Sequence, residues 1–233
     1  MASSANEWRP FVSRLVGIFG GTFNPIHVGH LRAAEEVAEQ LGLARVLFVP
    51  AADPPLKRAD GQALAPAADR LAWVTAAIRD NPLFEASALE LERKGPSYTV
   101  DTLRALRAEL APAELVFVVG QDAFVDLDSW RQPEVLPTLA HFAVVTRPPG
   151  GGDLPDWLPS SLAASCEIDA DGQGARHREA GTWIRRLEIS ALDVSATDLR
   201  HRLREGRSVR YLVPEAAREA IEKSLSYRGT AEP

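Results

Sequence analysis

Apolar and polar positions follow one another along this chain in the pattern of a parallel α/β sheet. Helical spacing of apolar residues predicts helices between and after short apolar runs, and such runs usually form buried strands. Runs that are apolar on both faces, such as 115–119, suit a sheet that is covered on both sides. The expected strands are 14–19, 45–49, 115–119, 142–145 and 184–189, and the expected helices are 28–41, 67–78, 99–110, 196–205 and 214–224. We therefore predict an α/β fold, a Rossmann-like open and mostly parallel sheet with helices on both faces and a helical C-terminal part.

Two segments depart from this alternation. Residues 1–12 lack the basic-then-apolar layout of a secretion signal, so we interpret them as a flexible leader. Residues 148–182 are rich in Gly, Pro, Ser and Asp without a clear period, which predicts an irregular surface excursion with room for one short helix near Trp157. Residues 13–233 are then a single domain whose C-terminal helices lie within 195–224.

Composition and charge narrow the class of protein. Hydrophobic residues make up 45% and charged residues 25%, as in ordinary globular enzymes, and no apolar run is long enough to span a bilayer. The single cysteine, Cys166, excludes an intramolecular disulfide and fits a cytoplasmic protein. A net charge of −6 argues against nucleic acid as a partner, so a small anionic substrate needs a local positive pocket. Assembly into a homo-oligomer is left open.

The segment GIFGGTFNPIHVGH, residues 17–30, joins the first predicted strand to the first helix. Ligands of open parallel sheets bind beyond the carboxyl ends of the strands. Gly20 and Gly21 lie where we expect the backbone to turn, which would let N–H groups approach a phosphate. The helix begins either with Asn24 as its N-cap and Pro25 at its first position, or later, near His27. Either start points free N–H groups at the site, an arrangement that favours an anion.

His27 and His30 are three residues apart, so on a helix they share one face. Two imidazoles there can donate hydrogen bonds to a phosphoryl group as charge builds on its oxygens. The glycines are not followed by the Gly-Lys-Ser/Thr of a P-loop, and the dinucleotide fingerprint GxGxxG is absent. No third ligand for zinc stands nearby, so no metal site is predicted. The plainer alternative is a glycine-rich turn with two surface histidines.

The string GGTFNPIHVGH at 20–30 resembles the nucleotidyltransferase superfamily marked by (H/T)xGH, which is related in fold to class I aminoacyl-tRNA synthetases. Within it, the chain is similar to the bacterial nicotinate-nucleotide adenylyltransferases. The further matching segments occur in the family's order: DPPLK at 53–57, GPSYTVDTL at 95–103, GQDAFVDLDSW at 120–130, VSATDLRHRL at 194–203 and VRYLVP at 209–214.

This resemblance implies transfer of the adenylyl group of ATP to nicotinate mononucleotide, with Mg²⁺, giving nicotinate adenine dinucleotide and pyrophosphate in NAD biosynthesis. The acceptor phosphate would attack the α-phosphorus in line without a covalent enzyme intermediate, so catalysis would rest on positioning and charge stabilisation. The alternatives are the same chemistry on nicotinamide mononucleotide or phosphopantetheine, and a nucleotide sensor without turnover.

The resemblance also implies roles for individual residues. The catalytic residues would be His27, His30, Lys57 and Arg200. The ATP-binding residues would be Gly20, Gly21, Thr22, Phe23, Gly120, Asp122, Ser195 and Thr197. The residues that bind the nicotinate nucleotide would be Thr99, Trp130, Arg131 and Arg147. Asp122 and Ser195 are explained equally well as helix N-caps, and Trp130 as ordinary packing.

Three positions depart from the family pattern. Asn24, Leu56 and Ala196 stand where the family has aspartate, histidine and serine. The first of them weakens any role of this position in handling Mg²⁺.

Overall fold

The computed structural model describes residues 14–55, 64–146, 158–190 and 192–227. Lys57 and Arg147, both predicted to contact substrates, lie outside these residues, as do Leu56, Trp157 and the N-terminal leader. The short helix expected near Trp157 is found at Ser160–Ala163.

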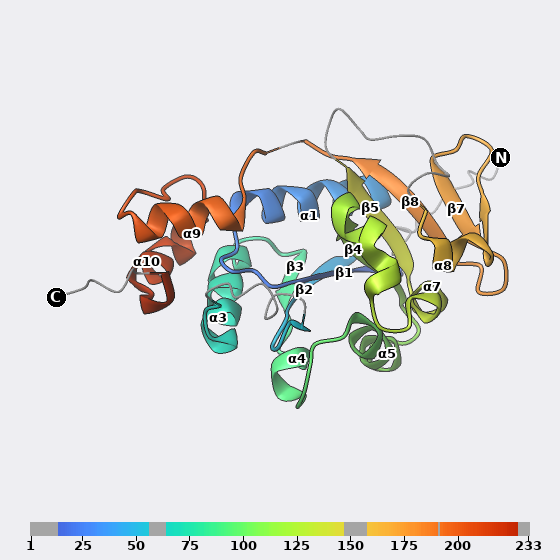
Figure 1. Ribbon diagram of the computed structural model, residues 1–233, viewed down its shortest axis with the longest axis horizontal. Helices are drawn as coiled ribbons and strands as arrows, with labels where there is room; N and C mark the ends of the chain where they lie inside the picture. The colour runs from blue at the N-terminus through green and yellow to red at the C-terminus, as the bar shows by residue number, and fades with distance from the viewer. Residues whose placement is uncertain (1–13, 56–63, 147–157, 191, 228–233) are drawn as a thin grey trace, which may run out of the picture.

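One sheet of eight strands runs through the described part of the chain, in the order β3-β2-β1-β4-β5-β8-β7-β6 (Figure 1). Neighbouring strands are parallel from β3 to β8, whereas β8 with β7 and β7 with β6 pair antiparallel. The strands are β1 (Leu15–Gly21), β2 (Arg45–Pro50), β3 (Phe84–Ala86), β4 (Glu114–Gly120), β5 (His141–Thr146), β6 (Cys166–Ile168), β7 (Gly174–His177) and β8 (Trp183–Glu188). The mostly parallel sheet that the apolar runs predicted is confirmed.

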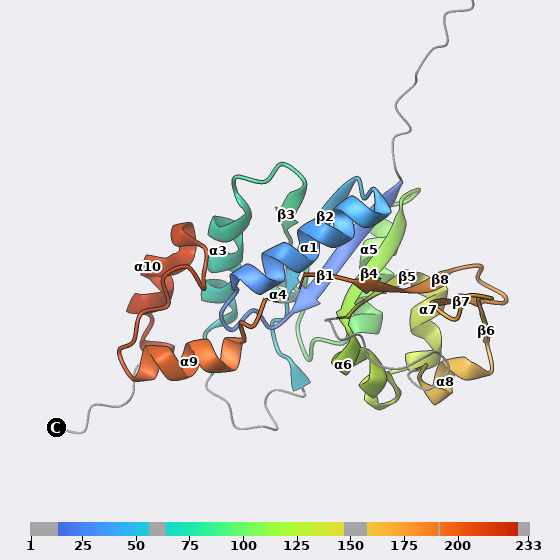
Figure 2. The same ribbon diagram turned by 90° about the horizontal axis from the view of Figure 1, so that it is seen from above.

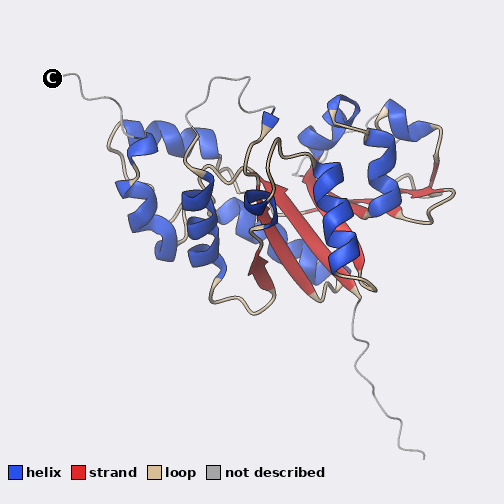
Figure 3. Cartoon of the chain, turned by 90° about the horizontal axis from the view of Figure 1, so that it is seen from below, coloured by secondary structure: helices blue, strands red, loops and turns tan. Residues whose placement is uncertain are grey.

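Helices cover both faces of this sheet. The helices are α1 (Val28–Leu41), α3 (Ala67–Ile78), α4 (Leu89–Glu92), α5 (Thr99–Glu109), α6 (Gln121–Val125), α7 (Leu136–Leu139), α8 (Ser160–Ala163), α9 (Ala196–Arg204) and α10 (Glu215–Lys223). One apolar cluster joins the sheet to α1, α3, α9 and α10, and a second joins it to α5, α6, α7 and α8. Figure 2 shows α9 and α10 beside α3 at one end of the molecule, and Figure 3 shows the strands between the helical layers.

The prediction that residues 148–182 form an irregular excursion is wrong for the described part, residues 158–182. This part contains α8 and the hairpin β6–β7, which extends the sheet beyond β8. Cys166 pairs with His177, and Gly172 takes a positive φ of 67° in the connection. These strands are three and four residues long and carry charged side chains, so they have no apolar run to indicate them.

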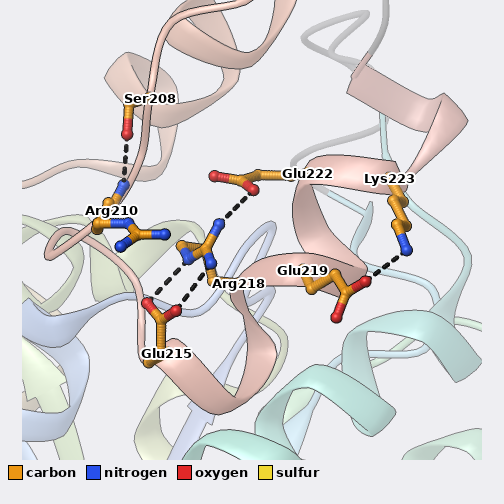
Figure 4. A network of polar contacts seen from close by, with 7 residues as sticks. All are labelled: Ser208, Arg210, Glu215, Arg218, Glu219, Glu222 and Lys223. Atoms are coloured by element: carbon orange, nitrogen blue, oxygen red, sulfur yellow. Dashed lines mark hydrogen bonds and ion pairs between the residues drawn. The ribbon is translucent and has the colours of Figure 1, made fainter.

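The surface of α10 carries a chain of ion pairs (Figure 4). Arg218 binds Glu215 at 2.8 Å and Glu222 at 2.6 Å, which are spacings of three and four residues along the helix. Ion pairs near the surface contribute little to stability, and α10 also packs against α3. Among the described residues, no helix is long and apolar enough to cross a membrane.

Candidate active site

Three cavities meet at the carboxyl ends of β1 and β4. The largest, of about 590 Å³, lies between the start of α1 and residues 189–196. A second, of about 410 Å³, is lined mainly by apolar groups and lies beside the start of α5. The two share Phe19, Gly20, Gly21 and Gly120. A third, of about 230 Å³, adjoins the largest near Arg200. Two large ligands can therefore bind side by side, with their adjoining ends at these glycines.

Gly20 and Gly21 belong to the last part of β1, so the prediction that the backbone turns at these glycines is wrong. The residue with a positive φ is Phe23, at 47°. Gly21 leaves room for a ring, because a Cβ on it would lie 3.1 Å from the ring of Phe23, whereas a Cβ on Gly20 would be in ordinary contact, 3.4 Å from the ring of Phe117. The absence of side chains here keeps the wall between the two large cavities thin.

Helix α1 begins at His27, which is its N-cap in extended conformation, so the later of the two predicted starts is confirmed. Asn24 is not the N-cap. It is buried at 5% exposure, and its Oδ1 accepts hydrogen bonds from the backbone N–H of Ala65 at 3.1 Å and the hydroxyl of Tyr227 at 2.5 Å. Asn24 thus joins the loop after β1 to two distant segments of the chain.

His27 and His30 form a capping box at the start of α1. The N–H of His27 donates to Nδ1 of His30 at 3.2 Å, and the two rings stack with their centroids 3.6 Å apart. Because a backbone N–H can only donate, Nδ1 of His30 is an acceptor, and the proton of the neutral ring lies on Nε2. Both histidines line the largest cavity, and a Cβ on Gly29 would lie 3.0 Å from Nδ1 of His27. The predicted pairing of the two rings on one face of the site is confirmed.

Arg200, on α9, is buried and lines the smallest cavity. Its guanidinium donates to the carbonyl of Asn24 at 2.9 Å and to Oγ1 of Thr197 at 3.0 Å. Burial lowers the pKa of Arg200, but a guanidinium stays charged in proteins. Ser195 is the N-cap of α9 and accepts from the N–H of Asp198 at 3.1 Å, so its capping role is confirmed. The start of α9 therefore presents a fixed positive charge and free N–H groups to one cavity.

The remaining predicted residues divide between the two large cavities. Asp122 lines the largest, and Gly120 lines both; Gly120 is the N-cap of α6, so the N-cap interpretation of Asp122 is wrong. Thr99, Trp130 and Arg131 line the apolar cavity. The ring of Trp130 lies edge-on to Phe117, with centroids 6.1 Å apart. The aromatic ring of Trp130 and the N-terminus of α5 thus form two sides of this cavity.

Comparison with known proteins identifies the family. A model of the cytidylyltransferase-like family matches residues 18–202. A relative from Acidothermus cellulolyticus, named probable nicotinate-nucleotide adenylyltransferase, is 41% identical over 220 residues, which are 92% of this chain and 95% of the relative. A relative of the same name from Geobacter sulfurreducens is 43% identical over 213 residues, covering 91% of this chain and 97% of its own. The chain belongs to the nicotinate-nucleotide adenylyltransferase family.

The fold of this nicotinate-nucleotide adenylyltransferase family member also matches solved structures. Plasmodium falciparum nicotinic acid mononucleotide adenylyltransferase complexed with NaAD superimposes with a TM-score of 0.66 at 17% identity, covering 90% of this chain and 95% of that one. The same enzyme complexed with APC gives a TM-score of 0.64. At this level of identity the likeness shows the α/β fold.

Sequence reasoning missed a buried polar cluster behind the site of this adenylyltransferase. Arg70 and Tyr227 are fully buried, and Tyr227 comes from the far end of the chain. Burial raises the pKa of the Tyr227 hydroxyl above its usual range, although Arg200 and Arg70 oppose this, so the group stays a neutral donor. A lone tyrosine near the end of a chain gives no signal in sequence that it will bind Asn24.

Replacing Tyr227 by phenylalanine should lower the free energy of unfolding by about 1–2 kcal/mol, because a buried hydroxyl and one hydrogen bond to Asn24 are lost. Urea unfolding followed by circular dichroism measures this. Tyr211→Phe is the matched control, since Tyr211 is 83% exposed and should show no change. Equal stabilities of the two variants would contradict the described link.

Proposed function

We propose that this chain transfers the adenylyl group of ATP to the phosphate of nicotinate mononucleotide, releasing pyrophosphate and forming nicotinate adenine dinucleotide for NAD biosynthesis. The observation that carries this proposal is the meeting of two large cavities at Gly20 and Gly21, with the His27–His30 pair lining the larger of them. The relatives that are about 40% identical over nearly the whole chain carry the name of this activity.

ATP occupies the largest cavity in this proposal. Asp122 accepts hydrogen bonds from the ribose hydroxyls of the adenosine, beside the exposed Gly120. The triphosphate runs toward the start of α9, where Ser195 lines the largest cavity and Thr197 and Arg200 line the smallest one. A helix start and a buried guanidinium are the features that favour a phosphate chain there.

Nicotinate mononucleotide occupies the apolar cavity. The pyridine ring lies against Trp130. The free N–H groups at the N-terminus of α5, near Thr99, donate hydrogen bonds to the ring carboxylate. Arg131 is held over the ring of Tyr98 at 4.7 Å at the same cavity and adds positive charge. Because the two cavities share Gly20 and Gly21, the acceptor phosphate lies next to the α-phosphorus of ATP.

The chemistry needs no nucleophilic side chain. Holding the acceptor phosphate in line with the α-phosphorus can lower the activation barrier by about 7–11 kcal/mol. His27 and His30 donate to the α-phosphate oxygens as negative charge grows on them. Mg²⁺ enters as the complex with ATP, bound mainly by the phosphates of the nucleotide. Lys57, from the DPPLK segment, supplies further positive charge, and Arg147 assists the acceptor.

The decisive experiment gives the purified protein Mg-ATP with nicotinate mononucleotide, nicotinamide mononucleotide or phosphopantetheine and follows release of pyrophosphate. We expect the fastest turnover with nicotinate mononucleotide. A preference for phosphopantetheine would contradict the assignment, and ATP binding without pyrophosphate release on any acceptor would identify a sensor.

Replacing Gly120 by alanine tests where the substrates lie. Gly120 has φ −68°, and a Cβ there would meet no atom within 4 Å, so the free protein should keep its stability. The Cβ would project between the two substrates, and we expect KM for at least one of them to rise about tenfold, or about 1.4 kcal/mol. Gly42→Ala is the matched control: Gly42 has φ 60°, so alanine should destabilise the fold without changing KM. Unchanged KM values for Gly120→Ala would place the substrates elsewhere.

A further inference from the structure

Arg70 is a charged residue on the first turn of α3 that the proposed mechanism does not use. Its side chain is fully buried, at 0% exposure. Burying a guanidinium costs free energy unless its N–H groups form hydrogen bonds. The partners of these N–H groups therefore indicate the role of Arg70. Among the described residues, Arg70 forms no ion pair; burial lowers its pKa, and the nearby carboxylate of Glu90 partly opposes this. Arg70 therefore does not serve to form a buried salt bridge.

The guanidinium of Arg70 instead binds three backbone carbonyl groups. Nη1 donates to Thr22 at 2.6 Å, Nε donates to Ala65 at 2.9 Å, and Nη2 reaches Ala52 at 3.4 Å. Thr22 directly follows β1, Ala52 follows β2, and Ala65 precedes α3. One side chain thus holds three segments at the edge of the sheet that carries the candidate site.

The shortest of these bonds determines how the peptide between Thr22 and Phe23 is oriented. This peptide is trans, so its carbonyl and its N–H point in opposite directions. Arg70 lines none of the three cavities, whereas Thr22 and Phe23 both line the smallest one. With the Thr22 carbonyl bound to Arg70, the N–H of Phe23 in the same peptide points away from Arg70.

We propose that Arg70 is a positioning residue: by binding the Thr22 carbonyl, it aims the N–H of Phe23 at the phosphate oxygens of the bound nucleotide. This inference rests on the proposed function for the identity of the anion. A backbone N–H aimed at developing charge needs no reorganisation during the reaction. If the peptide were to rotate, the carbonyl oxygen would face the phosphates and repel them.

The test separates this orienting role from the charge of Arg70. In Arg70→Lys the positive charge remains, but a single ammonium cannot reproduce the fork that binds separate carbonyl groups. We expect kcat to fall on the order of 100-fold, the usual cost of losing one such donor, with KM for nicotinate mononucleotide little changed. Arg79→Lys is the matched control, because Arg79 is the C-cap of the same helix and its side chain is 66% exposed. Wild-type kcat in Arg70→Lys would overturn the proposal.

Spectroscopy follows the N–H group itself. In protein labelled with ¹⁵N-phenylalanine, with the signal of Phe23 assigned through Phe23→Leu, we expect the Phe23 amide proton to move downfield when Mg-ATP is added to the wild type. The same addition should leave it nearly unmoved in Arg70→Lys. An unmoved Phe23 amide in the wild type would overturn the proposal whether or not the variant folds. A downfield shift in a protein that turns over no acceptor would leave the positioning role supported and refute the proposed reaction.

Discussion

Replacing His27 by asparagine should lower kcat about 100- to 1000-fold and leave the fold intact. The imidazole of His27 lines the largest cavity and is expected to donate to the α-phosphate as charge develops, and losing such a donor has an effect of this size. Asparagine is among the best N-caps, so the start of α1 should survive the change. Steady-state release of pyrophosphate and thermal unfolding measure the two effects.

Two companion variants make the His27 result interpretable. His27→Ala should show a similar loss of kcat and also lose about 1 kcal/mol of stability, because alanine cannot cap the helix. His201→Asn, on the exposed surface of α9, should behave as the wild type. Near-normal turnover in His27→Asn would show that the reacting phosphate lies elsewhere.

Substitutions of His30 should separate the role of Nδ1, which accepts from the N–H of His27, from the role of Nε2, which is expected to donate to the phosphate. The Oδ1 of asparagine lies near the position of Nδ1, so His30→Asn keeps an acceptor for the N–H of His27 but loses the Nε2 donor. The longer amide of glutamine can place an N–H near Nε2 but loses the acceptor. We expect kcat to fall about 100-fold in His30→Asn and about tenfold in His30→Gln, while His30→Gln should be the less stable by about 1 kcal/mol.

The order of the two His30 variants is the informative result. Turnover assays and urea unfolding of both proteins give it directly. If His30→Asn were the more active variant, Nδ1 rather than Nε2 would be the atom that serves the reaction, and the tautomer derived from the capping bond would be wrong.

The elements with strong apolar periodicity were predictable from the sequence. Helix 67–78 and helix 28–41 agree with α3 and α1 at both ends, because their apolar faces pack on a sheet of apolar strands. The hairpin β6–β7 was not predictable, since its strands take their stability from pairing with β8 and not from apolar side chains of their own.

The chemistry of the site was predictable only in part. The spacing of His27 and His30 indicated that their rings would lie together, but the capping bond that orients them depends on where the helix starts. The glycines were expected in a turn, whereas they lie in β1, and Gly21 makes room for the aromatic ring of Phe23. The partners of Asn24 could not be predicted, because Tyr227 is 203 residues away and no local pattern links the two.

A crystal structure of the protein with nicotinate adenine dinucleotide bound would test the account most directly. We predict that the adenosine lies in the 590 Å³ cavity beside Asp122 and that the pyridine ring lies against Trp130 in the 410 Å³ cavity. The bridging phosphates should lie beside Gly20 and Gly21, about 3 Å from a nitrogen of His27 or His30. A dinucleotide bound with its phosphates away from both imidazoles would contradict the proposed site.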